Sequence, residues 1–331
     1  MNYHFRYGGG EFFSLSWVTM AYDASHLPPP SKKARHGSAV AASNQMSNAD
    51  FRAMKAKLGR QRTAAVHSFC GEVAPGSSGQ ECAAWCLKST GDPGPPPTSM
   101  VLWDRDRGGS TLVEPSSGAG FRGTTCFLEG DMISRAASLA AQGEGVVVLN
   151  MANRHRPGGG FLTAARAQEE QLCHRSDLFP RLKLLLRHAN QYYYIWPGTA
   201  VLTPEVALRL QGKEGGFAPL DDPACVSVVS AAADQFRSED AARRDPDLVE
   251  RIEANWRAVL SACGRSGATV AVLSALGCGA FQNPPDVVGA ALKRVLSEPL
   301  DFGKLEEVEV VILDDHNSRE NVTRFRQGLG I

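Results

Sequence analysis

Short apolar runs alternate with amphipathic segments along the last two thirds of the chain. Each run is bounded by glycine or polar residues, a pattern typical of strands that a sheet buries on both faces. We expect strands at 124–128, 146–150, 225–230, 269–274 and 308–313, and short strands with loop over 192–217. Because helical segments separate the strands and no unit repeats at a fixed period, the pattern predicts an α/β fold. Its mixed central sheet is expected to be covered by helices on both faces.

Apolar residues recur at helical spacing between these strands. The strongest pattern spans 248–263 and is stopped by Gly264 and Gly267, since glycine favours helix ends. Further helices are predicted after Asp131, from about Gln168 and after Pro285. In the second of these, the apolar face reaches Phe179 and Pro180 interrupts the helix.

The first third of the chain has a different composition. Residues 1–48 contain runs of glycine and proline with many serines and alanines, so we expect a disordered N-terminal extension. Residues 49–110 are predicted to hold one amphipathic helix followed by a proline- and glycine-rich insertion. The regular α/β alternation begins near Thr111, so 111–331 is predicted to be the folded α/β domain.

The composition is that of an ordinary globular protein with one sizeable core, at 331 residues and 43% hydrophobic content. Lysine plus arginine equals aspartate plus glutamate at 35 each, so no overall field attracts nucleic acid or an anionic membrane. No segment approaches the ~20 apolar residues of a membrane span, and 12–22 lacks a clear signal-peptide cleavage site. The short run of Lys32, Lys33 and Arg35 is a weak nuclear address, so we expect a cytoplasmic or nuclear protein rather than a secreted one.

Eight cysteines are scattered along the chain, a usage typical of a reducing compartment. Cys82 and Cys86 form the only close pair in the sequence, and no second pair or histidine stands at ligand spacing from them. The sequence therefore predicts no metal site, and we expect no cofactor.

The stretch 146–176 combines a buried strand, a loop with three consecutive glycines and an acidic triplet. A ligand is expected at the carboxyl end of that strand. Glycines 158–160 allow the backbone to approach a ligand closely and to direct N–H groups at it, so an anion such as a diphosphate is the expected guest. Glu169 and Glu170 project about 100° apart around a helix, so one carboxylate is expected to orient the substrate while the other transfers protons.

The segment from Asn150 through Gly158-Gly159-Gly160 to Gln168-Glu169-Glu170, followed by Leu172-Cys173-x-Arg175-Ser176, resembles the microbial-type poly(ADP-ribose) glycohydrolases. Those are catalytic macrodomains marked by a triple-glycine loop and a nearby Gln-Glu-Glu. The resemblance covers roughly 111–331 and implies a three-layer α/β/α macrodomain-like fold for this domain. It assigns Glu170 to protonate the departing ribose oxygen and then to activate water, and Glu169 to hold the adjacent ribose hydroxyls. Gln168 and the three glycines are implied to bind substrate.

A second glycine-rich loop, Leu276-Gly277-Cys278-Gly279-Ala280-Phe281, follows the strand at 269–274. A diphosphate needs backbone N–H groups on both sides, and this loop supplies the second side. The loop also resembles the family's Gly-Cys-Gly-x-Phe element, which implies that Gly277, Cys278, Gly279, Ala280 and Phe281 contact the ligand. Taken alone, the loop is more typical of a strand-to-helix turn that needs glycine, and the alternative role of Phe281 is to seal the core.

Three polar residues near strand ends extend the resemblance. Gly130-Asp131 resembles the macrodomain element whose aspartate accepts a hydrogen bond from the adenine amine. An aspartate before a helix is also typical of an N-cap, and the two roles are compatible. Asn150-Met151-Ala152-Asn153 resembles the macrodomain Asn-Ala-Ala-Asn, which implies that Asn150 and Asn153 line the site. Asn153 would contact the distal ribose, and its alternative role is to bond the loop backbone.

Other charged residues near these motifs are weaker candidates. Glu170 and His174 are four apart on the predicted helix, but such pairs are common on helix surfaces, so we do not assign His174 to the site. The run 314–316, Asp-Asp-His, is more typical of a polar strand exit. The run 154–156, Arg-His-Arg, either adds positive charge near the expected diphosphate or points into solvent.

The resemblance implies a hydrolase that cleaves the ribose–ribose O-glycosidic bonds of poly(ADP-ribose) and releases ADP-ribose. One alternative is a mono-ADP-ribosyl hydrolase acting on protein or nucleic-acid adducts, and another is a non-catalytic ADP-ribose reader, which would not need an acidic pair. The expected partners are poly(ADP-ribose) or ADP-ribosylated proteins. The expected process is the reversal of ADP-ribosylation, such as occurs in the DNA damage response. We expect a monomer without base-specific nucleic-acid contacts and without a membrane partner. Chain-length preference and endo versus exo cleavage stay open.

Overall fold

A computed structural model describes residues 3–6, 12–15, 111–113, 117–163, 165–182, 193–313 and 319–331. Within the first 110 residues it describes β1 (Tyr3–Arg6) and β2 (Phe12–Leu15), which pair antiparallel in a sheet of their own. The rest of the expected extension, the helix and insertion of 49–110, and the run 314–316 lie outside the described residues. The predictions made for those segments are unchanged.

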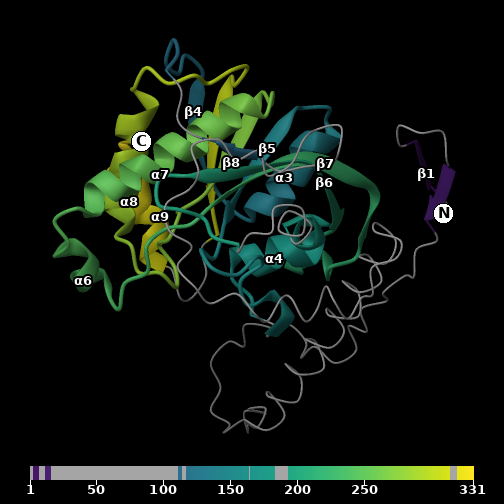
Figure 1. Cartoon of the computed structure of the whole chain (residues 1–331), viewed down its shortest axis with the longest axis horizontal. Helices are drawn as coiled ribbons and strands as arrows, with labels where there is room; N and C mark the ends of the chain where they lie inside the picture. Colours follow the sequence, from purple (N-terminus) through teal and green to yellow (C-terminus); the bar gives the residue numbers. More distant parts are fainter. Residues whose placement is uncertain are drawn as a thin grey trace, which may run out of the picture.

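Seven strands form one mixed sheet in the order β3-β6-β7-β5-β8-β9-β4 (Figure 1). They are β3 (Thr111–Val113), β4 (Thr124–Glu129), β5 (Val146–Met151), β6 (Ala200–Leu210), β7 (Pro219–Ala231), β8 (Val270–Leu273) and β9 (Glu307–Ile312). Strand β5 pairs parallel with both β7 and β8, and β9 pairs parallel with β8 and β4. Strand β6 runs antiparallel to β7 and to β3. The predicted mixed central sheet is confirmed.

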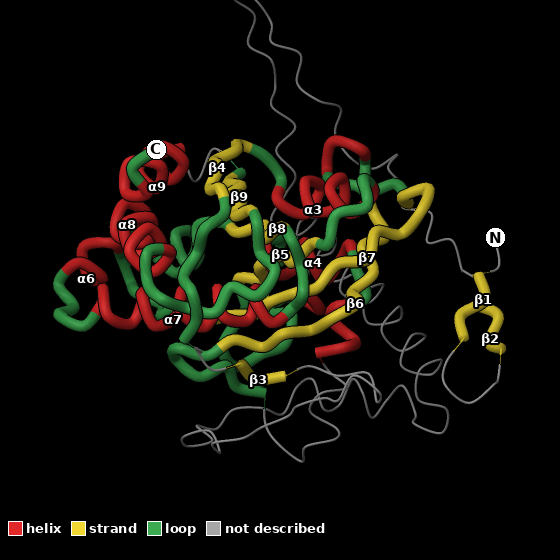
Figure 2. Tube along the Cα trace, turned by 90° about the horizontal axis from the view of Figure 1, so that it is seen from above, coloured by secondary structure: helices red, strands yellow, loops and turns green. Residues whose placement is uncertain are grey.

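Helices cover this sheet in layers. The described α-helices with assigned bounds are α3 (Met132–Ala141), α4 (Gln168–Arg175), α6 (Glu239–Arg243), α7 (Leu248–Arg265), α8 (Pro285–Leu296) and α9 (Arg319–Leu329). Helix α3 packs against β5 and β7, whereas α7 packs against β6 and β7. Figures 1 and 2 both show α3 and α4 on one side of β4, β8 and β9, and α8 and α9 on the other. The predicted three-layer α/β/α arrangement is therefore confirmed.

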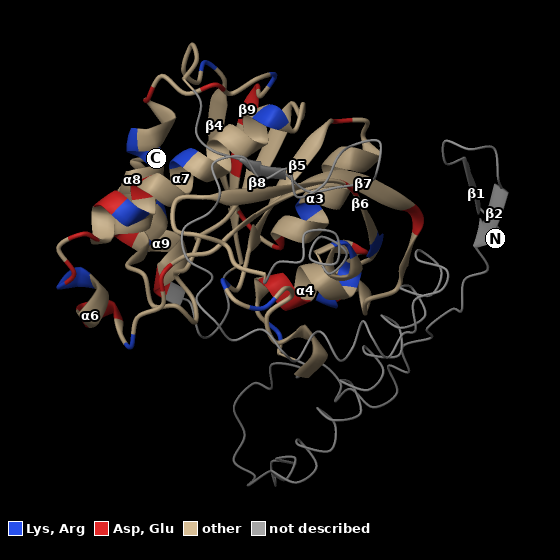
Figure 3. Cartoon of the chain, in the orientation of Figure 1, with Lys and Arg blue, Asp and Glu red and all other residues tan. Residues whose placement is uncertain are grey.

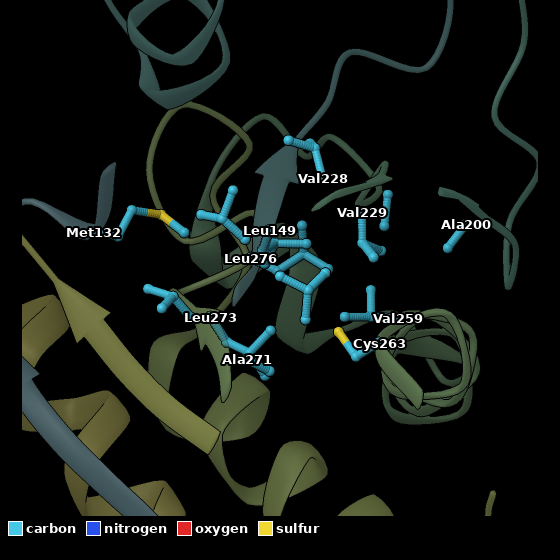
Figure 4. Close-up of a cluster of buried hydrophobic side chains, with 14 of the residues drawn as sticks. Met132, Leu149, Ala200, Val228, Val229, Val259, Cys263, Ala271, Leu273 and Leu276 are labelled. Atoms are coloured by element: carbon cyan, nitrogen blue, oxygen red, sulfur yellow. The ribbon is translucent and has the colours of Figure 1, made fainter. Parts of the chain in front are cut away.

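The core is centred on β5, whose residues Val147, Val148 and Leu149 are fully buried. Burying each such side chain contributes about 1.5–3 kcal/mol, so the strand is held firmly on both faces. Figure 4 shows side chains from several elements meeting around it: Met132 of α3, Val228 and Val229 of β7, Leu273 of β8, and Val259 and Cys263 of α7. The end of β5 is thus a rigid base for the loop that follows it.

Strand β6 is longer than the sequence predicts. It spans eleven residues where we expected short strands with loop over 192–217. Pro204 and Glu205 interrupt its apolar pattern, and its pairing with β7 shifts register between Thr203 and Val206. Glu205 has a φ of 56° in the left-handed region, as a bulge permits. Because the bulge breaks the apolar pattern, the periodicity of the sequence does not reveal that the strand is continuous.

Helix α4 is shorter than predicted and ends at Arg175, before Pro180. Ser176 takes up extended backbone and bridges Leu208 of β6. Its hydroxyl donates to the carbonyl of Leu172 at 2.6 Å, which satisfies a carbonyl of the last turn. Pairing with β6, rather than the proline, thus ends the helix.

Helix α9 is absent from our predicted elements because we followed the pattern only as far as the last strand. Its buried residues Val322, Phe325 and Leu329 recur at helical spacing, and the helix packs on α8.

Acidic and basic residues are interspersed over the described chain, as Figure 3 shows. No described helix is long and apolar enough to cross a bilayer.

Candidate active site

The loops that follow β5, β7 and β8 meet at one edge of the sheet, because these three strands are parallel neighbours. Arg154 Nη2, in the loop after β5, donates to Asp234 Oδ1 in the loop after β7 at 2.7 Å. Asn283 Nδ2, beyond β8, donates to the carbonyl of Asp234 at 2.8 Å. Phe236 N donates to the carbonyl of Phe281 at 3.0 Å. Both glycine-rich loops are therefore fixed to the same central loop.

Gln168 fastens the first turn of α4 to the end of β5. Its Oε1 accepts from Met151 N, and its Nε2 donates to the carbonyl of Leu149, both at 2.8 Å. The carboxamide thus makes the same kind of hydrogen bonds to β5 that a paired strand would make, and both of its polar atoms bond the protein backbone. This geometry gives Gln168 a positioning role within the site.

Glu169 is 3% exposed and ties down the loop between Asn153 and Gly158. Its Oε2 accepts from Asn153 N at 2.7 Å, and its Oε1 accepts from Gly158 N at 2.9 Å. Burial raises the pKa of Glu169 to about 8, and the charge of Glu170 adds to the rise, while the two backbone hydrogen bonds oppose it. The side chain therefore supports the loop and also holds a proton near neutral pH.

Glu170 has one carboxylate oxygen engaged and the other unpaired. Oε1 accepts from Gly160 N at 2.7 Å. Oε2 is fully buried and has no hydrogen-bond partner among the described residues. Leaving such an atom unpaired costs about 1–3 kcal/mol, so its presence calls for an explanation. An oxygen in this state is available to give or take a proton.

The triple-glycine loop is shaped around the two carboxylates. Gly158 and Gly159 have φ values of 72° and 53°, in the left-handed region that favours glycine. A Cβ at Gly159 would lie 2.6 Å from Glu170 Oε1 and 2.8 Å from Glu169 Oε2. The acidic pair, visible as the red turn at the start of α4 in Figure 3, therefore requires glycine opposite it.

Our expectation that this loop directs its N–H groups at a diphosphate is wrong. The N–H groups of Gly158 and Gly160 donate to Glu169 and Glu170, and that of Gly159 donates to the carbonyl of Arg156 at 2.9 Å. Because all three donors are used within the protein, the loop orients the acidic pair instead. Contacts of these glycines with a ligand stay a prediction.

The second loop is built in the opposite way. The N–H groups of Gly277, Gly279, Ala280 and Phe281 have no acceptor in the part of the chain that the structure describes. Asn283 Nδ2 donates to the carbonyl of Gly277 at 3.1 Å and holds the loop from its other side. A Cβ at Gly279 would meet no atom within 4 Å. This loop has the open donors that an anion site needs.

Asp131 caps α3, as predicted. Its Oδ1 accepts from Ile133 N at 2.9 Å, and its Oδ2 accepts from the hydroxyl of Ser134 at 2.9 Å. Arg175, which is 2% exposed, donates from Nη1 to Asp131 Oδ2 at 2.5 Å and from Nε to the carbonyl of Leu210 at 3.1 Å. The aspartate therefore joins α3 to α4, and its contact with adenine stays a prediction.

The two asparagines after β5 differ in their roles. Asn150 is fully buried; its Nδ2 donates to the hydroxyl of Ser230 at 3.0 Å, and its Oδ1 has no partner among the described residues. Asn153 Oδ1 accepts from the N–H groups of His155 and Arg156, both at 3.0 Å. The loop-bonding alternative is thus confirmed for Asn153, and its ribose contact stays a prediction.

Sequence reasoning missed the framework of ion pairs behind the loops. Asp234 binds Arg154 and also Arg251, whose Nε donates to Asp234 Oδ2 at 2.6 Å. Arg154 therefore points to a carboxylate rather than into solvent. An aspartate shortly after a buried strand is a weak signal, and nothing in the sequence indicates which arginine it binds.

Tyr193 is a further residue that the sequence did not mark. It is 6% exposed, and its hydroxyl is fully buried without a partner among the described residues. Burial, and then the charge of Glu169, raise its pKa well above the ordinary value. It belongs to a run of three tyrosines at 192–194, which gives no hint of which ring is buried.

One described group of side chains has a spacing that suits a metal ion, and it lies away from these loops. Cys126 of β4 and Glu307 and Glu309 of β9 place their ligand atoms within 4.8 Å of one another. However, Arg135 occupies both oxygens of Glu309, at 2.5 Å and 2.7 Å. Burial further raises the pKa of Cys126 to about 11, which disfavours a thiolate ligand.

Comparison with known proteins now adds to this geometry. Residues 111–197 match the family described as the catalytic domain of microbial-type poly(ADP-ribose) glycohydrolase (PARG). This segment of the chain is similar to that family. The match contains the acidic pair, the triple-glycine loop and Tyr193. No curated protein matches the chain.

Solved structures of bacterial PARG proteins resemble the whole domain. The protein from Deinococcus radiodurans in complex with ADP-ribose is 25% identical, with a TM-score of 0.53 over 67% of this chain and 94% of its own. The protein from Thermomonospora curvata is 20% identical, with a TM-score of 0.57 over 84% of this chain and 100% of its own. The same protein bound to the inhibitor ADP-HPD is 19% identical, with a TM-score of 0.53 over 83% of this chain and 99% of its own. The Thermomonospora structures share the fold with this chain.

Proposed function

We propose that this protein is a poly(ADP-ribose) glycohydrolase, which cleaves the ribose–ribose O-glycosidic bonds of poly(ADP-ribose) and releases ADP-ribose. The observation that carries the proposal is the unpaired, buried Oε2 of Glu170 beside a second buried carboxylate. Glycosidases use a carboxyl group in such surroundings to transfer a proton. The family match and the ADP-ribose bound to the Deinococcus radiodurans protein support this choice of substrate.

Glu170 acts first as an acid and then as a base. Its Oε2 gives a proton to the departing ribose oxygen while the bond from that oxygen to the anomeric carbon breaks. Water then adds to the anomeric carbon, and its proton passes to Glu170, which restores the starting state. One water molecule is consumed for each ADP-ribose released. Because Gly160 N–H holds Oε1, both steps use the same oxygen.

Glu169 supports this chemistry from the adjacent position. Its two hydrogen bonds keep the loop in place, and its remaining lone pairs accept hydrogen bonds from ribose hydroxyls. The raised pKa of Glu169 means that the carboxylate pair holds a proton near neutral pH. That proton is the one the first step requires.

The rest of the ligand lies along the adjoining loops in this proposal. The open N–H groups of the second loop, 277–281, bind the diphosphate, and Phe281 stacks on a ring of the ligand. Asn150 and Asn153 face the distal ribose, and Asp131 accepts from the adenine amine. The site thus extends from α3, past the acidic pair, to the loop after β8.

Two other functions use much of the same site. A mono-ADP-ribosyl hydrolase would need the acidic pair but no room for a further polymer unit. A non-catalytic reader would need the diphosphate site alone, and burying two carboxylates together would then destabilise the fold without benefit. The cost of the acidic pair is the observation that favours an enzyme.

Product analysis tests the proposal. The full chain is incubated with labelled poly(ADP-ribose) and, separately, with mono-ADP-ribosylated protein, and the products are resolved by chromatography. We expect ADP-ribose from the polymer. Release from the mono-ADP-ribosylated protein alone would favour the first alternative, and tight binding of ADP-ribose without release from either substrate would favour the reader.

A further inference from the structure

Buried polar atoms without partners gather at the site. Of the six fully buried side-chain atoms that lack a hydrogen-bond partner in the described part of the chain, four belong to residues around the acidic pair. They are Asn150 Oδ1, Arg154 Nε, Glu170 Oε2 and the Tyr193 hydroxyl. The proposed function uses Asn150 and Glu170, and Arg154 holds a loop. The Tyr193 hydroxyl alone has no role so far.

That hydroxyl destabilises the fold where it stands. An unpaired buried hydroxyl loses its hydrogen bonds to water and gains none, whereas a phenylalanine would fill the same space without this loss. A side chain that weakens the fold in this way is most often retained for function. Tyr193 is therefore a candidate for a role in the reaction.

The surroundings of the ring indicate what the hydroxyl does. Ile195 N donates to the carbonyl of Arg154 at 3.0 Å, so 193–196 runs beside the loop that Glu169 holds. Besides burial, Glu169 and Cys173 raise the pKa of the hydroxyl, and these two residues lie one turn apart on the same side of α4. Since burial and Glu169 keep the pKa of Tyr193 well above 10.0, the group stays protonated and offers a donor.

We propose that Tyr193 is a positioning residue whose hydroxyl donates a hydrogen bond to the Glu169 carboxylate through one water. Each oxygen of Glu169 accepts one backbone N–H and keeps a second lone pair for this bond. The inference rests on the proposed function, because it assigns the proton that the reaction uses.

The two carboxylates compete for one proton, and hydrogen-bond donors decide which of them stays ionised. Glu170 accepts from one backbone N–H, that of Gly160, whereas Glu169 accepts from two, and the side chain of Asn150 also lowers the pKa of Glu169. A further donor from Tyr193 lowers the pKa of Glu169 and thereby favours transfer of the shared proton to Glu170, where the first step needs it.

The test compares Tyr193→Phe with Tyr194→Phe, a neighbouring half-buried tyrosine whose ring contacts His155 and Trp196. For Tyr193→Phe we expect kcat on the polymer to fall about tenfold, with KM within about threefold of wild type. The thermal midpoint should stay close to that of wild type, because phenylalanine fills the same space. Tyr194→Phe should match the wild type in all three measurements.

A second readout does not depend on turnover. In protein labelled with ¹³C at the glutamate carboxyls, the titration of Glu169 should move up by about half a pH unit or more in Tyr193→Phe. In wild-type protein labelled at tyrosine Cζ, the Tyr193 signal should shift as Glu169 titrates, and this holds even if the variant does not fold. A wild type that releases no ADP-ribose would refute the proposed function but leave both titrations informative. The role of Tyr193 would be overturned if the titration of Glu169 is unchanged in Tyr193→Phe, or if the Tyr193 signal of the wild type does not shift as Glu169 titrates.

Discussion

The two glycine-rich loops of the site have similar composition but opposite hydrogen bonding. In the first loop, 158–160, the N–H groups of all three glycines are used within the protein, two of them by the acidic pair. In the second loop, Gly277, Gly279, Ala280 and Phe281 keep N–H groups with no acceptor in the described chain. A run of glycines therefore does not by itself indicate an anion site.

The difference assigns a task to each loop. The first loop fixes two carboxylates that would otherwise repel each other, so it belongs to the chemistry. The second offers unused donors at a place where an added Cβ would meet no atom, so we assign it to ligand binding. Substitutions in the first loop should affect turnover, and those in the second should affect affinity.

The largest effect is expected for Gly159→Ala. The new Cβ must displace the oxygens of Glu169 and Glu170, and the φ of 53° adds strain. We expect turnover of poly(ADP-ribose) to fall by about 10³-fold or more, because both carboxylates lose their geometry. Activity assays with circular dichroism measure this on a folded variant. Near-normal turnover would contradict the role given to the loop.

A smaller and different effect is expected for the matched change Gly279→Ala. The methyl group enters open space in the free protein, so stability should stay within about 0.5 kcal/mol of wild type. ADP-ribose affinity should fall about tenfold, the equivalent of one hydrogen bond to a charged group. Calorimetric titration with ADP-ribose measures this affinity. Unchanged affinity would mean that the diphosphate does not approach this loop.

Gln168→Ala tests how the first loop's carboxylates are positioned. The variant removes the link from α4 to the backbone of Leu149 and Met151 and leaves buried backbone groups unpaired. We expect a loss of about 1–3 kcal/mol in the free energy of unfolding. Urea denaturation gives the value, with Gln171→Ala on the same helix as the control. Equal stability of the two variants would show that the link is dispensable.

The pH dependence of stability provides the finest test. The fold raises the pKa of Glu169 from its ordinary 4.5 to about 8, so it favours the neutral carboxyl. The contribution of Glu169 to stability is complete below pH 4.5 and is lost as pH rises through about 8.

In Glu169→Gln one backbone N–H loses its acceptor, because the amide nitrogen of glutamine cannot accept a hydrogen bond. The resulting loss of stability does not vary with pH. The wild type should therefore lose its stability advantage over this variant between pH 5 and pH 9, approximately as the Glu169 pKa shift requires. Denaturation at several pH values measures the difference in stability between the wild type and Glu169→Gln. The control is Glu250→Gln, a substitution at an exposed glutamate. A constant difference would mean that Glu169 is not buried as described.

Much of the fold could be predicted from sequence because its strands are short, apolar and separated by strong helical patterns. The predicted runs 146–150 and 225–230, which lie in β5 and β7, and the helix around Trp256 follow this rule. Strand β6 was missed because Pro204 and Glu205 break the alternation at a bulge that only the partner strand makes favourable.

The site was harder to predict than the fold. The Gln-Glu-Glu triplet and the glycines could be located because they are adjacent in sequence. The direction of the glycine N–H groups could not, since the acceptors of Gly158 and Gly160 stand ten or more residues away on α4. Tyr193 was missed for the same reason: the burial of its hydroxyl depends on how the chain returns past α4.

Glu170→Gln tests the central claim most directly. The substitution keeps the shape of the side chain and the bond from Gly160 N but removes the titratable oxygen. Two quantities are measured on one preparation: release of ADP-ribose from polymer, and equilibrium binding of free ADP-ribose. We expect release to fall by about 10²–10⁴-fold or more, with affinity within about threefold of wild type, because we assign the diphosphate contacts to the other loop. A folded Glu170→Gln variant that releases ADP-ribose as fast as wild type would contradict the account.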